Sequence, residues 1–233
     1  MRVKLRKYSE GKFNIQEYEL DITGKPTVLE ILMRIKEELD PSLAFRAMCR
    51  ASICGTCAVK VNGQHKLACN TRVEGEEVLI EPVDGFKPIR DLVVSHEEIY
   101  ERLKPSRVWF VPKDGNMKLL PEVQRRTAKA WDCILCGICN NVCPPLLEKV
   151  DFGGPLLFTR VYKTLDDPRD SLGENRLENL AAFNVQKCVH CSNCNLFCPK
   201  GCMPEKWINV IEGKLVQKGY IQKKKEDFDF LGF

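Results

Sequence analysis

Two runs of cysteines constrain the fold of this chain more than any other feature of its sequence. Residues 133–144 read CILCGICNNVCP and residues 188–199 read CVHCSNCNLFCP, so both have the spacing C-x2-C-x2-C-x3-C followed by proline. Spacings of two residues let three thiols converge from one tight turn. The second half of the chain is therefore expected to fold around these runs, which form an internal repeat about fifty-five residues apart.

The number of cysteines limits what they can bind. Thirteen cysteines fit either the disulfide framework of a secreted protein or metal binding in a reducing compartment. The N-terminal MRVKLRKYSEG lacks the apolar segment of a signal peptide, and no apolar run reaches the ~20 residues that a membrane-spanning helix needs. Gaps of two or three residues are also too short for disulfides between distant loops, so metal binding is the better interpretation.

The charge of the chain gives no indication of an anionic partner. The net charge is only +4, and the lysines near the C-terminus lack the interleaved aromatic residues of a nucleic-acid surface. Nucleic acid is therefore not expected as a partner.

The first hundred residues have the pattern of a small sheet with one helix. Alternating apolar and polar residues predict strands at 2–8, 12–20 and 76–82, and a hairpin around Asn62-Gly63 within 57–69. A helix is predicted from Thr27, its N-cap, to the residues before Pro41. One face of this helix carries Val28, Leu32, Ile35 and Leu39.

The strand pattern ends near residue 89, where the apolar positions begin to suit short helices. Residues 176–188 are an example, with helical spacing of Leu177, Leu180, Ala181 and Val185. We therefore predict an α+β protein with two domains, 1–105 with the sheet and 106–233 all-helical. The boundary near Pro105 rests on this change of pattern.

The first of three cysteine groups lies in the N-terminal domain. It has the spacing C-x4-C-x2-C-x11-C and consists of Cys49, Cys54, Cys57 and Cys69. The opening of this spacing matches the ligands of a plant-type [2Fe–2S] cluster, and Gly55 leaves room for a backbone that curls around sulfur. Zinc is the alternative, but zinc sites favour two C-x2-C pairs and only one is present here.

The two tandem runs predict two [4Fe–4S] clusters with crossed ligands. In two-cluster bacterial ferredoxins, the fourth cysteine of such a run binds the cluster of the other run. One cluster is then held by Cys133, Cys136, Cys139 and Cys198, and the other by Cys143, Cys188, Cys191 and Cys194. If Cys191 is not a ligand, the second cluster is [3Fe–4S] instead.

The remaining candidate residues are not expected to perform chemistry on a substrate. We interpret Cys202, the thirteenth cysteine, as a small buried apolar residue. His65, His96 and His190 are placed in the hairpin, in a helix and between cluster ligands. A hydrogen bond from His190 would tune a neighbouring cluster, but its ring is expected to face solvent. The pattern includes no catalytic triad, carboxylate pair or phosphate-binding loop, so the chain is predicted to carry electrons and to contribute no catalytic residue.

These features together resemble the iron–sulfur subunit of succinate dehydrogenase and fumarate reductase, over essentially the whole chain. The matching features are the interval of eleven residues before Cys69, the segment PIRDLVV from Pro88 to Val94, the run CILCGICNNVCP, and CPKG at 198–201. The resemblance implies a β-grasp [2Fe–2S] ferredoxin-like domain followed by a helical domain similar to two-cluster bacterial ferredoxins.

The resemblance also implies a position within a larger enzyme. A flavoprotein subunit with FAD interconverts succinate and fumarate in that family, and this chain is expected to pass electrons from the flavin through its three clusters to a quinone. The flavin releases two electrons whereas a cluster accepts one, which requires a series of centres. The chain is then expected to lie at the cytoplasmic side of the membrane, peripherally, against a membrane-anchor subunit.

Two departures from the family pattern bear on the electron acceptor. Most members have another residue in place of Cys191 and a terminal [3Fe–4S] cluster, so this chain is expected to hold a full [4Fe–4S] cluster there. The tryptophans and the histidine that help to form the family's quinone pocket are replaced by PLLEKV and Val189. Both departures resemble variant enzymes of archaea and some bacteria, whose anchor subunits are non-classical and cysteine-rich.

Three alternatives remain at this point. The relay could end on a thiol/disulfide couple, as in thiol-dependent fumarate reductases, or the chain could be a free-standing ferredoxin with several partners. A structural zinc protein is the third alternative. The C-terminal EDFDFLGF argues against a free ferredoxin if its aromatic side chains need a partner to cover them.

Overall fold

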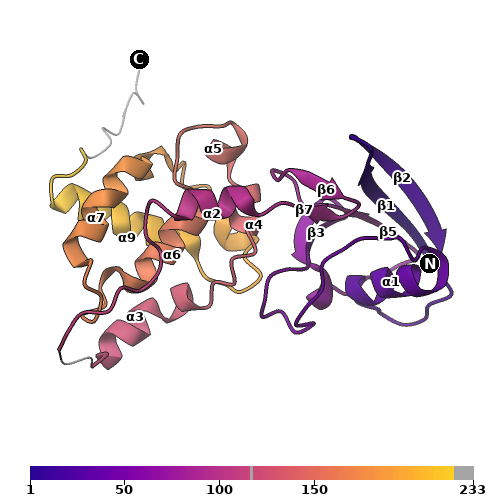
Figure 1. Cartoon of the computed structure of the whole chain (residues 1–233), viewed down its shortest axis with the longest axis horizontal. Helices are drawn as coiled ribbons and strands as arrows, with labels where there is room; N and C mark the ends of the chain where they lie inside the picture. Colours follow the sequence, from indigo (N-terminus) through magenta and orange to yellow (C-terminus); the bar gives the residue numbers. More distant parts are fainter. Residues whose placement is uncertain (116–117, 223–233) are drawn as a thin grey trace, which may run out of the picture.

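The computed structural model describes residues 1–115 and 118–222 and has two lobes, one built on a sheet and one built of helices (Figure 1). The C-terminal EDFDFLGF lies outside the described residues. The predicted α+β class is confirmed, with the sheet in the N-terminal part and the helices after it.

The sheet lobe is a five-stranded mixed sheet in the order β2-β1-β5-β3-β4. Its strands are β1 (Arg2–Ser9), β2 (Lys12–Glu19), β3 (Ala58–Val61), β4 (Gln64–Leu67) and β5 (Glu77–Glu81). The first strand pairs antiparallel with β2 and parallel with β5, and β3 pairs antiparallel with both β4 and β5. This β-grasp arrangement contains every strand that alternation predicted.

The helix of this lobe starts as predicted and ends differently. α1 (Val28–Arg34) begins at a capping box in which the Thr27 hydroxyl accepts from the Glu30 N–H and the Glu30 carboxylate accepts from the Thr27 N–H. A wider π-helical turn, Ile35–Leu39, extends it. Leu39 is 49% exposed, so it does not share the buried face of Val28, Leu32 and Ile35 that the spacing predicted. The change from α-helical to π-helical hydrogen bonding alters the angular spacing of the side chains.

A short two-stranded ribbon follows the sheet, formed by β6 (Pro88–Arg90) and β7 (Val93–Val94). Asp91, between its strands, exchanges two backbone hydrogen bonds with Tyr8 at 3.1 and 2.7 Å, which ties the ribbon to β1. The sequence pattern missed this ribbon because strands of two and three residues are too short to show alternation.

The helical lobe packs around α6 (Pro155–Leu165), which is buried along almost its whole length. The other helices are α2 (Glu97–Leu103), α3 (Pro121–Trp131), α4 (Ile138–Asn141), α5 (Pro144–Leu147), α7 (Gly173–Leu180), α8 (Asn193–Leu196) and α9 (Pro204–Gln217). Across the α6–α9 contact, the rings of Tyr162 and Trp207 stack with centroids 4.4 Å apart. Within residues 97–115 and 118–222 there is no strand, only a single bridge between Pro112 and Asp170.

The helix predicted over 176–188 is broken. α7 ends at Leu180, and two 3₁₀ turns follow, Ala181–Phe183 and Val185–Lys187, separated by Asn184 in the left-handed conformation with φ of 50°. Leu177, Leu180 and Val185 are nonetheless buried in the core, as their spacing predicted.

The two lobes are packed directly against each other. Phe86, just before the ribbon, packs against both hydrophobic cores. Gly137 adopts φ of 79°, and a Cβ at this position would lie 2.8 Å from side-chain atoms of Ile99 and of Phe86. Ile99 and Leu103 place α2 in the core of the helical lobe, and the domain boundary near Pro105 stays a prediction.

Candidate metal centres

The first cysteine group lies on an irregular loop, as expected, whose amides point at sulfur. The Sγ of Cys49 accepts hydrogen bonds from the N–H groups of Ala51 (3.4 Å), Ile53 (3.3 Å) and Cys54 (3.3 Å). The loop makes this turn with Arg50, Ser52 and Gly55 at positive φ. These amides lower the pKa of Cys49 to about 6, with Ala51 contributing most.

The other three thiols of this group lie beside Cys49. Cys54 hydrogen-bonds to Cys49, and Cys57 interacts with both Cys54 and Cys69. The Ser52 N–H donates to the Cys69 Sγ at 3.3 Å. Burial raises the pKa of Cys57 to about 11. The loop and the hairpin strand thus bring four sulfurs together, with backbone donors that stabilise negative charge on sulfur.

The second group combines the first tandem run with one cysteine from the other run. Cys133 and Cys136 precede α4, and Cys139 lies within it. Cys198, from the second run, interacts electrostatically with all three. Burial raises the pKa of Cys136 to about 12. The structure therefore brings together the four residues that the crossed pattern predicted.

The third group mirrors the second. Cys143 interacts with Cys188 and Cys191, and Cys194 interacts with Cys188 and Cys143. Burial raises the pKa of Cys143 to about 11 and that of Cys194 to about 12. Only Cys191 in this group is exposed. Cys139 of the second group also interacts with Cys194, so the two crossed groups are neighbours.

The first and second groups touch each other through backbone. A Cβ added to Gly55 would lie 2.7 Å from the carbonyl oxygen of Ile134 and 3.0 Å from the Cβ of Cys136. Gly55 belongs to the loop of the first group, and Cys136 belongs to the second. The three groups therefore follow one another in contact, and α4 lies on the side of the helical lobe that faces the sheet (Figure 1).

A fifth sulfur is present at the second group, which the sequence did not predict. Cys202 is buried, as expected, but its thiol hydrogen-bonds with Cys133 and Cys198. These hydrogen bonds lower the pKa of Cys133 to about 7 and that of Cys198 to about 6. The signal available in the sequence was its position only four residues after Cys198.

The histidines lie in ordinary environments. His65 is buried in the hairpin, accepts from the Asp84 N–H at 3.2 Å, and has its pKa lowered by burial. His96 is the N-cap of α2 and lies 3.1 Å from the Arg46 guanidinium. His190 is partly exposed between the carboxylates of Glu205 and Glu212, at 3.8 and 3.7 Å.

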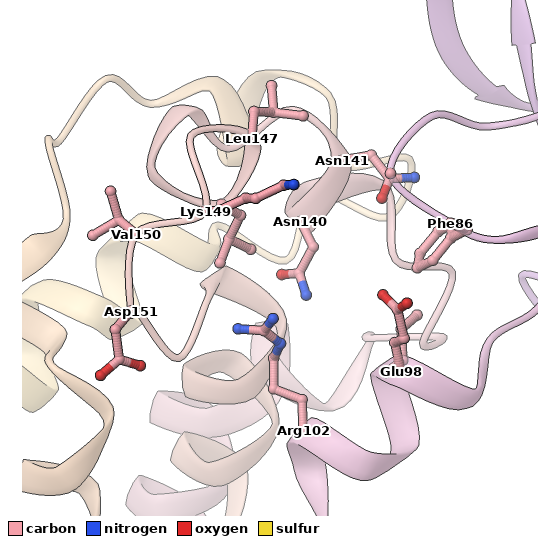
Figure 2. Close-up of a pocket in the computed structure, with 12 residues that line it drawn as sticks. Phe86, Glu98, Arg102, Asn140, Asn141, Leu147, Lys149, Val150 and Asp151 are labelled. Atoms are coloured by element: carbon pink, nitrogen blue, oxygen red, sulfur yellow. The ribbon is translucent and has the colours of Figure 1, made fainter.

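A cavity of about 530 Å³ opens between α2 and the segment that holds α4 and α5. Figure 2 shows the Glu98 carboxylate and the Arg102 guanidinium directed into it, and Lys149 and Asp151 line the opposite side. Arg102 also donates to the carbonyl of Phe152 at 2.9 Å. The lining includes no cysteine, histidine or serine, so it offers no pair of nucleophile and base.

Two features are absent from residues 1–115 and 118–222. No three or more His, Cys, Asp or Glu side chains are arranged there to hold one metal ion. No helix in the same residues is both long and apolar enough to cross a bilayer. The residues of each group fit an iron–sulfur cluster with several iron atoms, because neighbouring thiols can bind the irons and nearby amides can donate hydrogen bonds to sulfur.

A sheet lobe and a helical lobe with these three cysteine groups define an iron–sulfur electron-transfer protein. Residues 2–101 match the family described as a 2Fe-2S iron-sulfur cluster binding domain, and residues 129–202 match the 4Fe-4S dicluster domain. The cofactors are therefore [2Fe–2S] and [4Fe–4S] clusters, which removes the zinc alternative.

The particular family follows from comparison with whole proteins. The chain is 33% identical over 212 residues to succinate dehydrogenase [ubiquinone] iron-sulfur subunit 1, mitochondrial, of Oryza sativa subsp. japonica, a match that covers 86% of this chain and 75% of that protein. Its fold is similar to a chain of the Mycobacterium smegmatis Sdh1 complex in the apo form, with a TM-score of 0.83, 24% identity, and coverage of 95% and 97% of the two chains. The chain belongs to the family of succinate dehydrogenase iron–sulfur subunits, which are electron-transfer subunits of an oxidoreductase, and the predicted resemblance is confirmed.

Proposed function

We propose that this chain relays single electrons between the FAD of a flavoprotein subunit and a quinone bound at a membrane-anchor subunit. The observation that carries the proposal is the unbroken series of three cysteine groups, with backbone contact at Gly55 and sulfur neighbours at Cys139 and Cys194. Iron–sulfur clusters supply one-electron redox chemistry at sites of this kind.

The proposed ligands are the three sets that the crossed pattern predicted. They are Cys49, Cys54, Cys57 and Cys69 for the [2Fe–2S] cluster; Cys133, Cys136, Cys139 and Cys198 for the first [4Fe–4S] cluster; and Cys143, Cys188, Cys191 and Cys194 for the second. The protein fixes the positions of the sulfurs and donates amide hydrogen bonds to several of them, including those of Cys49, Cys69 and Cys198.

The two ends of this series are the surfaces where partners are expected. At the first group, Met48 is 72% exposed and Ile53 is also exposed. At the third group, Leu196 is 77% exposed, and Val189 and Cys191 are exposed as well. Exposed apolar side chains at both ends of the series fit contacts with other subunits. We assign the first end to the flavoprotein and the second to the anchor.

We propose that the anchor is non-classical and cysteine-rich, because Leu147 and Val189 stand where the family's quinone pocket has other residues. This chain is proposed to bind the anchor peripherally, at the cytoplasmic side of the membrane. The second candidate function is a relay that passes electrons to a thiol/disulfide couple instead of a quinone. The two candidates have the same contact with the flavoprotein subunit and differ only in the partner that binds near Leu196.

The proposal is tested by purifying the native complex anaerobically with substitutions at each end. Met48→Glu is expected to weaken copurification of the flavoprotein subunit, and Leu196→Glu is expected to retain the flavoprotein but lose quinone reduction. Ile15→Glu is the control, because Ile15 is an apolar residue that is 61% exposed on β2, away from both ends.

Three results would contradict parts of the proposal. A parent protein that purifies alone would support the free ferredoxin. A complex that reduces a disulfide and no quinone would support the thiol acceptor. Equal effects of all three substitutions on copurification and quinone reduction would contradict the assignment of the first end to the flavoprotein and the second end to the anchor.

A further inference from the structure

The second cysteine group contains five sulfurs, although a [4Fe–4S] cluster has four iron corners. Cys202 is 2% exposed, and its thiol hydrogen-bonds with the sulfurs of both Cys133 and Cys198. Its own N–H donates to the Cys198 Sγ at 3.3 Å. The residue therefore contacts two of the proposed ligands through two separate groups.

The protein core holds Cys202 in this position. The indole N–H of Trp207 donates to the Cys202 carbonyl, and Trp207 itself is buried and stacked on Tyr162. Met203, which follows Cys202, is in the left-handed conformation with φ of 55° and directs the chain into α9. The thiol thus stays beside the ligand sulfurs because its backbone is fixed by packing.

The internal repeat shows that this fifth sulfur is specific to one cluster. Cys198 is the ligand that the second run contributes to the first cluster, and Cys202 follows it by four residues. Cys143 is the ligand that the first run contributes to the second cluster, and the residue four positions later is Leu147, which is 56% exposed. The second cluster therefore has no matching donor at this position.

We propose that Cys202 is a positioning residue whose S–H donates a hydrogen bond to the ligand sulfurs of Cys133 and Cys198, and so raises the reduction potential of the first [4Fe–4S] cluster. This inference rests on the ligand assignment proposed above. A donor to sulfur stabilises the more negative, reduced state of a cluster. A thiol has one proton, so it serves one sulfur at a time.

The test is an EPR-monitored redox titration of the assembled protein, with iron counted in every sample. Cys202→Ala and Cys202→Val remove the donor, and Val also fills most of the space. Both are expected to keep the full iron content and to lower the potential of the first [4Fe–4S] cluster by about 59 mV, which is a tenfold change in a one-electron equilibrium. Cys202→Ser keeps a donor and is expected to stay near the parent value. The second [4Fe–4S] cluster is the internal control and is expected not to move.

The possible results separate this inference from the function on which it rests. A parent that lacks the first [4Fe–4S] cluster would overturn both. In a parent that has this cluster, an unchanged potential in the Ala and Val variants would overturn the inference alone. Loss of iron from the first cluster in those variants would also overturn it, because Cys202 would then be a ligand. If Ala does not fold, Val and Ser give the same comparison.

Discussion

At the scale of single residues, several hydrogen-bond donors often converge on one negatively charged group. The three amides around Cys49 and the side chains around Asp40 follow the same rule in different places. Asp40 accepts from Lys7 at 2.8 Å, Tyr18 at 2.7 Å and Ser42 at 2.6 Å. One residue thus joins β1, β2 and the end of the α1 extension. The third cysteine group instead has one exposed member, Cys191, which we propose as a ligand of the second [4Fe–4S] cluster.

We expect Cys191→Ser to convert the second [4Fe–4S] cluster into a [3Fe–4S] cluster, because Cys191 supplies one corner and contributes to no other site. The variant should contain one iron fewer, and its oxidised form should show a [3Fe–4S] EPR signal that the parent lacks. The other two clusters should be unchanged. A strong [3Fe–4S] signal in a parent prepared under strict anaerobic conditions would show that Cys191 is not a ligand.

We expect Asp40→Asn to reduce the free energy of unfolding by about 1–3 kcal/mol at neutral pH, the usual cost of losing a buried hydrogen-bonded charge. The hydrogen bond from Lys7, followed by those from Ser42 and Tyr18, lowers the pKa of Asp40. A lowered folded-state pKa stabilises the protein above the unfolded value of about 3.9, and this stabilisation is lost as the pH falls through the folded value.

Urea denaturation from pH 7 down to acidic pH measures this dependence. The difference between parent and Asp40→Asn should shrink as the pH falls below about 4. Glu38→Gln is the control, because its ion pair with Arg34 is exposed, and it should change stability by less than about 1 kcal/mol. A difference that stays constant with pH would exclude the charge of Asp40 as its origin.

At the scale of elements, the connections between helices and strands bring the cysteine groups together. The loop before β3 carries most of the first group, and the turns before α4 and α8 carry most of the other two. These segments are short and use positive φ at residues such as Ser52, Leu135 and His190, which helices and strands do not allow. Gly55 is the point where two such segments meet.

We expect Gly55→Ala to push the loop of the first group away from the turn at Cys136. The new Cβ would lie 2.7 Å from a backbone oxygen, which cannot be relieved by rotating a side chain. Electron transfer between the [2Fe–2S] and the first [4Fe–4S] cluster should slow, and stability should fall by about 1–3 kcal/mol from strain. Freeze-quench EPR during reduction measures the first effect.

Gly24→Ala is the matched control for this prediction. Gly24 also has positive φ, 84°, but a Cβ there would meet nothing within 4 Å. It should cost stability without changing the rate of transfer between clusters. Equal rates in the Gly55 and Gly24 variants would contradict a role for the contact in setting the distance.

At the scale of the whole molecule, the two lobes depend on their clusters to different degrees. The sheet lobe has a continuous apolar core through β1, α1 and β5. The helical lobe includes cysteines of both crossed groups within its core, among them Cys139, Cys143, Cys188 and Cys194. Without iron, those buried thiols lose the bonds that join segments about fifty-five residues apart.

We therefore expect removal of iron by chelation and oxidation to unfold the helical lobe while the sheet lobe keeps partial order, since metal binding and folding are coupled where ligands hold the core together. Hydrogen exchange should accelerate in α6 and α9 more than in β1 and β5. The parent with its clusters is the control. Equal protection of both lobes in the apoprotein would contradict this expectation.

The sequence by itself determined the class of protein, the strands of the sheet, the start of α1 and the membership of the three cysteine groups. It could do so because cluster ligation requires fixed spacings and because strand alternation is a local property. The tertiary structure alone decided the exposure of Leu39, the ribbon β6–β7, the contact at Gly55 and the place of Cys202 beside Cys133. Each of these depends on atoms that are distant in the chain or on a turn too short to leave a periodic pattern, so no local pattern could indicate them.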